Sequence, residues 1–202
     1  MFNTAPQENI NDPNGVKERI LAAGRAEFAQ HGLSAGSVRA IGERAGVTAA
    51  MINYYFGGKR ALYDAVIAEA QARLGARIAA AFAGDRAGLA PRLAGAYFDF
   101  LSEEQELQRL LLREVLDRGA SVRELAARYV QPLRALFEEY FGKDDEAMHL
   151  AVSLFGAIAG YFLYEPLLGA FLGVDPHSAD ALARRRRHVI RLATQFEEMP
   201  HP

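Results

Sequence analysis

Two short stretches with helical spacing, separated by a glycine, most constrain what this chain can fold into. Residues 37–46 (SVRAIGERAG) place apolar side chains three or four positions apart, after a serine that can cap a helix N-terminus. Gly46 follows where that helix should end, because glycine adopts a left-handed backbone without strain. Thr48 can cap a second helix with Ile52 and Phe56 on its inner face. The pattern predicts a helix-turn-helix, whose second helix enters the DNA major groove, although an ordinary helical hairpin shares the same turn.

The flanking sequence makes the DNA-binding interpretation more specific. Residues 20–28 predict a preceding amphipathic helix that ends at His31-Gly32, and a further helix is expected from Lys59 onwards. The block 16–74 resembles the N-terminal DNA-binding domain of the TetR family of bacterial regulators, through its FAQHG helix end, its SVRAIGERAGV helix and turn, and its YYFGGK run. At Ala50 and Asn53 the chain departs from the commonest family pattern and looks like a known subgroup, so these departures concern which bases are read and leave the expected fold unchanged.

The resemblance implies which side chains contact DNA. Asn53 can pair with adenine through two hydrogen bonds, and Ala49 and Met51 can touch thymine methyl groups. The side chains that match phosphate-holding positions of the family are Ser37, Tyr54, Tyr55 and Lys59. Either tyrosine could instead pack in the core. The full set of predicted DNA-binding residues is Ser37, Thr48, Ala49, Ala50, Met51, Asn53, Tyr54, Tyr55 and Lys59.

Charge is distributed unevenly along the chain, whose net charge is −2. Residues 16–60 contain seven basic and three acidic residues, whereas residues 61–202 contain 16 basic and 20 acidic residues. A basic segment followed by an acidic rest of the chain suits a protein that presents one end to a polyanion. Solvent-exposed helix faces can produce the same change of charge along the chain.

The first 15 residues predict a flexible arm. They contain no Lys or Arg, and they lack the basic start and apolar run of a secretory signal, so a cytoplasmic location is expected. The chain has no cysteine, which excludes a disulfide framework.

After residue 74 the sequence predicts helices throughout. The expected helices cover residues 92–101, 107–116, 122–141 with a break near Pro132, about 146 onwards, and 178–196. The predicted fold is therefore all-α. It combines a three-helix DNA-binding domain over residues 16–62, with a linking helix to about residue 82, and a helical ligand-binding and dimerisation domain over residues 63–202.

The segment of residues 150–164 carries no charge. A membrane span needs about 20 predominantly apolar residues, and the interruption at Glu165-Pro166 favours a helix buried on several sides instead. The family resemblance implies that the last two long helices pair with those of a second subunit, with a purely intramolecular core as the alternative. The predicted interface residues are Gly156, Gly160, Leu182, Val189, Leu192, Ala193 and Phe196.

Aromatic residues in the middle of the chain predict an apolar ligand cavity, although rings at helical spacing also suit a plain core. The candidate lining residues are Tyr97, Phe98, Leu101, Leu111, Tyr129, Phe137, Phe155 and Tyr161, with Arg113 or Glu114 as a polar anchor.

Together these features predict a TetR-type repressor that binds a near-palindromic operator as a dimer and is released by a small apolar or aromatic ligand. No cofactor or metal is expected, because the five histidines lack partners at metal-binding spacing. One alternative is a DNA-binding architectural protein without small-molecule input. The other is an all-α enzyme, which would require Glu114, Asp117 and Glu165 to converge in a pocket.

Overall fold

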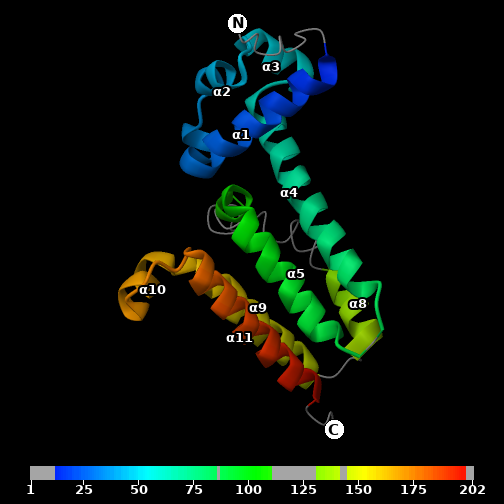
Figure 1. The fold of residues 1–202 in the computed structure, drawn as a ribbon. Helices are drawn as coiled ribbons and strands as arrows, with labels where there is room; N and C mark the ends of the chain where they lie inside the picture. The colour runs from blue at the N-terminus through cyan, green and yellow to red at the C-terminus, as the bar shows by residue number, and fades with distance from the viewer. Residues whose placement is uncertain (1–11, 86, 111–130, 142–144, 199–202) are drawn as a thin grey trace, which may run out of the picture. The chain divides into compact units, whose positions relative to one another are not determined.

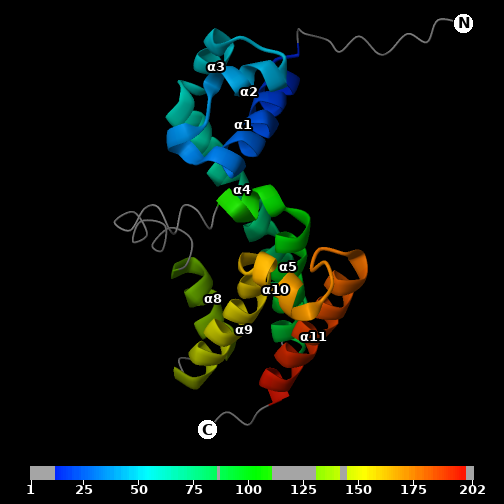
Figure 2. The same cartoon turned by 90° about the vertical axis from the view of Figure 1, so that its left-hand side faces the viewer.

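Helices form all the regular secondary structure in the part of the chain that the structure describes (Figures 1 and 2). The structure is a computed structural model, and it describes residues 12–85, 87–110, 131–141 and 145–198. The prediction of an all-α fold is confirmed. The chain divides into two units, which are described separately here. The first contains the described residues up to Ala70 together with 106–110, and the second contains the rest.

The first unit is built from α1 (Pro13–Ala35), α2 (Val38–Ala45), α3 (Ala49–Phe56) and the beginning of α4 (Lys59–Phe82). Asp12 caps α1 by accepting a hydrogen bond from the Asn14 amide, so this helix begins inside the arm expected over residues 1–15. Gly32 has φ 69°, where the sequence predicts the helix end, and a further helical turn follows to Ala35.

All the helices of the first unit contribute to one apolar core. Phe28 of α1 and Tyr63 of α4 meet edge to face, with ring centroids 5.1 Å apart. The Leu62 side chain fills the space above Gly24, where an added Cβ would lie 3.3 Å from it. Further fully buried members of this core are Val16, Ile20, Ile41, Ile52, Val66, Leu107 and Leu110. The buried face of each short helix therefore holds the helix-turn-helix in place.

The second unit contains the end of α4, α5 (Leu89–Glu103), α8 (Gln131–Phe141), α9 (Asp145–Leu163), α10 (Glu165–Leu172) and α11 (Ala179–Glu198). Helix α5 packs against α11 and α9, and α9 also packs against α11 (Figure 1). Pro132 is the second residue of α8, and the break expected just before it lies outside the described residues. The same is true of the expected helices at 111–116 and 122–130, whereas residues 107–110 are helical.

Two long-range polar contacts organise the start of α5. The Glu197 carboxylate on α11 accepts hydrogen bonds from the amides of Gly88 and Leu89, at 2.9 and 3.0 Å. It thereby places a negative charge at the α5 N-terminus, which favours one electrostatically. The Arg92 guanidinium donates to the Ala81 carbonyl in the last turn of α4, at 3.0 Å, and to the Asp85 carbonyl in the α4–α5 connection.

We expect Glu197→Ala to lower the free energy of unfolding by about 1–2 kcal/mol, because two amide groups at a helix N-terminus lose their acceptor. Glu198→Ala is the matched control, since Glu198 is an exposed carboxylate next to it. This control should stay within about 0.5 kcal/mol of the parent protein. Urea unfolding followed by circular dichroism measures both values, and equal effects of the two substitutions would contradict the capping role.

Candidate nucleic-acid interface

The turn between α2 and α3 is held by a close backbone contact. The Val47 amide donates to the Gly42 carbonyl at 2.9 Å, and Gly46 between them has the left-handed dihedrals φ 68° and ψ 35°. A Cβ added at Gly42 would lie 2.7 Å from the Val47 carbonyl oxygen, which is closer than real Cβ atoms approach. Both glycines are therefore required by the turn, one for its dihedrals and the other for space.

Side-chain caps fix both helix starts as the sequence predicts. Ser37 Oγ accepts from the Ala40 amide at 3.2 Å, and Thr48 Oγ1 accepts from the Met51 amide at 3.3 Å. The buried Glu27 carboxylate accepts from the Ser37 amide at 2.8 Å and so ties α1 to the start of α2. Each capping oxygen is used as an acceptor here, which leaves its O–H free to donate to a phosphate.

Helix α3 buries one face and presents the other. Ile52 is fully buried, whereas Ala49, Ala50 and Asn53 are exposed together with Thr48 at the cap. An outward face of small side chains around one amide is suited to a close approach to base edges in the major groove. Met51 is half-buried at the side of this face.

The aromatic residues at the end of α3 differ from each other in exposure. Tyr54 is 84% exposed, and Tyr55 is half-buried. Their rings meet edge to face with centroids 5.2 Å apart. The alternative in which Tyr54 is a core aromatic is therefore wrong for this structure. Its phenol is free to reach outwards, since Tyr55 supports its ring.

The basic side chains of the first unit differ in the contacts that they already make. Lys59 Nζ donates to the Ser34 carbonyl at 2.9 Å, which leaves two of its three N–H donors for an anion. Two further cations, Lys17 and the exposed Arg44, were not among the predicted DNA-binding residues. The Lys17 ammonium lies 5.7 Å from the centroid of the Phe56 ring. The positive charge of this segment was the only sign of them. Arg60, by contrast, is paired with Asp64 at 3.1 Å.

Most of the described residues that were predicted to line a ligand cavity lie in the core or in ring contacts with one another. Phe98 and Leu101 are core residues, and the Tyr161 hydroxyl donates to the Pro176 carbonyl at 2.8 Å. Tyr97 stacks on Phe155 with centroids 5.2 Å apart, and burial raises the pKa of the Tyr97 phenol. The candidates Leu111, Arg113, Glu114 and Tyr129 lie outside the described residues.

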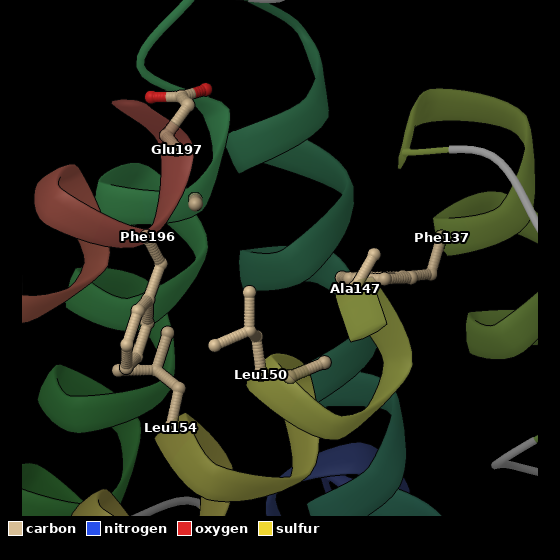
Figure 3. A pocket seen from close by; sticks show the side chains of 8 residues that line it. Phe137, Ala147, Leu150, Leu154, Phe196 and Glu197 are labelled. Carbon is tan, nitrogen blue, oxygen red and sulfur yellow. The ribbon is translucent and has the colours of Figure 1, made fainter. Parts of the chain in front are cut away.

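A small apolar pocket lies elsewhere in the second unit, where α5, α8, α9 and α11 meet (Figure 3). Its volume is about 40 Å³. Its lining residues are Ala90, Phe137, Ala147, Leu150, Ala151, Leu154, Phe196 and Glu197. Phe137 was predicted for the cavity and Phe196 for the subunit interface, whereas the small alanine side chains that create the space were not predicted.

The residues predicted for a subunit interface divide into two sets. Val189 and Ala193 are fully buried within the single chain, so they belong to its own core rather than to a free surface. Gly156 is exposed with no atom within 4 Å of an added Cβ, and Gly160 is half-buried. Leu182, Leu192 and Phe196 are also half-buried. The exposed apolar residues that the prediction did not include are Val152, Leu163, Tyr164, Leu167, Phe171, Leu172 and Val174.

Helix α9 is apolar enough to resemble a membrane span. Within the described residues, the segment Glu146–Leu163 is long and apolar enough to cross a membrane. One such helix is weak evidence for a membrane protein. Only 22% of this segment is buried, so much of its apolar surface is exposed. Such a face is also what a subunit interface requires.

The carboxylates of the enzyme alternative do not form a group in the described residues. Glu114 and Asp117 lie outside them, and Glu165 lies 3.0 Å from His177 Nε2. In the part of the chain that the structure describes, no cluster of three or more His, Cys, Asp and Glu side chains could hold a metal ion.

Comparison with known proteins gives two family matches. A family described as "Bacterial regulatory proteins, tetR family" matches residues 20–66, and one described as "Tetracyclin repressor-like, C-terminal domain" matches residues 90–192. The second match alone spans more than half of the 202 residues.

Individual relatives agree with these families. A probable helix-turn-helix transcriptional regulator, YttP of Bacillus subtilis, is 29% identical over 127 residues, which are 61% of this chain and 61% of that protein. A TetR-like regulator from Rhodococcus sp. RHA1 is 18% identical with a TM-score of 0.67, covering 92% of this chain and 97% of that one. A putative regulator from Streptomyces coelicolor is 24% identical with a TM-score of 0.65, covering 93% and 99%. At these identities the solved structures show a shared fold.

Two glycine substitutions should have opposite effects on stability. Gly42→Ala should lower the free energy of unfolding by about 1–3 kcal/mol and weaken DNA binding, because the added methyl group displaces the turn before α3. Gly75→Ala on α4 has open space around it and should raise stability by about 0.5–1 kcal/mol through helix propensity. Chemical unfolding and DNA titration measure both variants, and stabilisation by Gly42→Ala would refute the steric argument.

Proposed function

The chain belongs to the TetR family of bacterial regulatory proteins, and on this basis we propose that it is a dimeric repressor released from its operator by a small ligand. The observation that carries this proposal is the outward face of α3, which projects Asn53 from a backbone fixed at Gly42 and Gly46. The family assignment makes the chain a DNA-binding transcription regulator. Its operator, its dimeric state, its ligand and its cytoplasmic location are proposals.

We infer a division of labour between base contacts and phosphate contacts. Asn53 on the exposed face of α3 has the donor and acceptor needed to pair with adenine, and the neighbouring Ala49 and Ala50 leave room for thymine methyl groups. Phosphates would be held by the Ser37 hydroxyl, the Lys59 ammonium and the exposed phenol of Tyr54. Lys17 and Arg44 add positive charge that does not depend on sequence.

We propose that the subunit interface forms around the exposed face of α9. Gly156 offers a position where another helix can approach closely, and Val152 beside it is 65% exposed. An uncharged face of this kind is unfavourable in water, and a second copy would cover it with the same surface. Leu182 and Leu192 of α11 are half-buried and would contribute the remaining contacts.

Ligand release would follow from linkage between the two units. Helix α4 has residues in both units, so a change in the second unit has a direct connection along the chain through which to act. A ligand that prefers one arrangement of the dimer shifts the population towards it by no more than its differential affinity.

One observation favours the architectural alternative. The apolar pocket of about 40 Å³ holds only a few atoms, so an effector of ordinary size requires it to expand. A larger hollow of about 510 Å³ in the second unit is lined in part by charged side chains, among them Arg77, Asp99 and Arg186. An architectural DNA-binding protein needs no such expansion. The two functions therefore differ in whether any small molecule stabilises the protein and changes its DNA affinity.

A panel of small apolar and aromatic compounds should contain at least one that raises the melting temperature in proportion to the logarithm of its concentration and lowers operator affinity. Ala151→Phe, which fills the pocket, should abolish both responses and leave DNA binding of the free protein unchanged. Ala72→Phe at an exposed position of α4 is the control. If no compound in the panel altered operator affinity, the architectural function would replace ligand-controlled repression.

Selection from random duplexes should return near-palindromic sites, since two recognition helices related by a two-fold axis enter major grooves roughly 34–36 Å apart. If the selection returned only asymmetric or single-stranded sites, the protein would not bind DNA as a two-fold symmetric dimer.

Lys59→Ala should weaken binding to the selected operator and to other duplexes by a similar factor. It should also reduce the slope of log affinity against log salt concentration by about one. Asn53→Ala should instead change which sequences are preferred and keep the slope. Circular dichroism controls for folding, because Lys59 also donates to the Ser34 carbonyl. A changed base preference with an unchanged slope for Lys59→Ala would reverse the two assignments.

A further inference from the structure

Helix α10 and the residues after it expose an apolar surface, which we call the α10 projection and define as Leu167, Phe171, Leu172 and Val174. Leu167 and Phe171 are 70% and 85% exposed, and the other two are also exposed. Figure 1 shows α10 turned away from the α9–α11 pair at one end of it. An eight-residue helix is marginal in water without packing, so this helix requires cover for its apolar side chains.

The base of the projection is fixed by polar contacts. Glu165 in the first turn of α10 lies 3.0 Å from His177 Nε2, and the Gln105 amide lies 3.1 Å from Nδ1 of the same ring. The Tyr161 hydroxyl donates to the Pro176 carbonyl at 2.8 Å. Contacts before and after α10 therefore hold both ends of the segment, and the apolar side chains are presented on a fixed base.

The projection is continuous with the uncovered face of α9. Leu163 and Tyr164, which join the two helices, are exposed, as are Val152 and Phe155 further back along α9. Glu165 is the only charged residue between residues 150 and 174, and its carboxylate faces His177. Exposed apolar side chains thus occur along both α9 and α10, with a single charged residue between them in the sequence.

The charges beside the projection argue against a lipid surface. The two charged residues that flank it, Glu165 and Asp175, are both acidic. Helices that lie on anionic membranes carry Lys and Arg on their polar face, because these residues are attracted to the lipid headgroups. A second copy of the same chain offers a matching apolar surface without such a requirement.

We propose that α10 is an arm that lies across the exposed α9 face of a second copy, while the α10 of that copy covers the first chain. This inference rests on the proposed dimer and adds a reciprocal contact outside the α9–α11 pairing. A two-fold axis makes the exchange self-complementary, because both apolar surfaces occur on each chain. The acidic flanks remain at the rim, in contact with water.

The absence of cysteine allows a direct test in the full-length protein, with Phe171→Cys providing a unique thiol. The probe is the rate of reaction with 5,5′-dithiobis(2-nitrobenzoate), measured across protein concentrations whose oligomeric state is determined by sedimentation. Protection should rise at least about tenfold from monomer to dimer, because a covered thiol reacts only when its cover opens. Ala68→Cys, at an exposed position of α4, should react equally in both states.

If the dimer persists on dilution, Gly156→Glu supplies a monomer. A thiol that reacts equally fast in monomer and dimer would overturn the arm and leave the dimer intact. Protection in the monomer would assign the cover to the same chain, and protection only by vesicles of phosphatidylcholine and phosphatidylglycerol would assign it to lipid. A wild-type protein that is monomeric throughout would overturn both the arm and the proposed dimer.

A charge substitution provides an independent measurement. Phe171→Glu should raise the dimer dissociation constant at least about tenfold, or ~1.4 kcal/mol, because each arm would bury an unpaired carboxylate. Ala68→Glu should leave the constant unchanged, and circular dichroism should report full helix content for both. An unchanged constant for Phe171→Glu would refute the arm.

Discussion

Presentation of α3 depends on a backbone contact that only glycine permits. The Gly42 carbonyl accepts from the Val47 amide, and the Val47 carbonyl oxygen occupies the space that a side chain at position 42 would need. Because the two helices are short, their orientation is set by this turn and by the burial of Ile41 and Ile52. The outward face of α3 is the complement of that burial, so the surface offered to DNA follows from the packing beneath it.

Several polar groups of the proposed DNA interface already make hydrogen bonds within the fold. The Ser37 and Thr48 hydroxyl oxygens each accept one hydrogen bond from a helix N-terminus, and Lys59 donates one of its hydrogen bonds to the Ser34 carbonyl. These bonds hold the side chains in position while O–H and N–H groups remain for phosphates. Contacts that stabilise the fold thus also reduce the entropy that these side chains lose on binding.

In the second unit, the main physical requirement is that apolar side chains be buried away from water. Helix α11 hides Val189 and Ala193 against its own chain, and Glu197 ties its end to the start of α5. Helices α9 and α10 leave much of their apolar surface exposed, with Phe155 and Phe171 among the most accessible side chains. Helix α11 thus buries apolar side chains within the chain, whereas the exposed apolar side chains of α9 and α10 are the surface on which the proposed dimer rests.

The sequence alone determined the helical class, the turn at Gly46, the caps at Ser37 and Thr48, and the buried faces of α2 and α3, because these depend on neighbours within about four residues along the chain. Tertiary structure decided what such local rules leave open. A helical apolar stripe does not specify which neighbour covers it, so Val189 became core while Phe155, expected in a cavity, became exposed. Tyr54 and Tyr55 are adjacent and chemically identical, and only packing separated them. Glu197 found its partners 109 and 108 residues away, at a distance that no local pattern encodes.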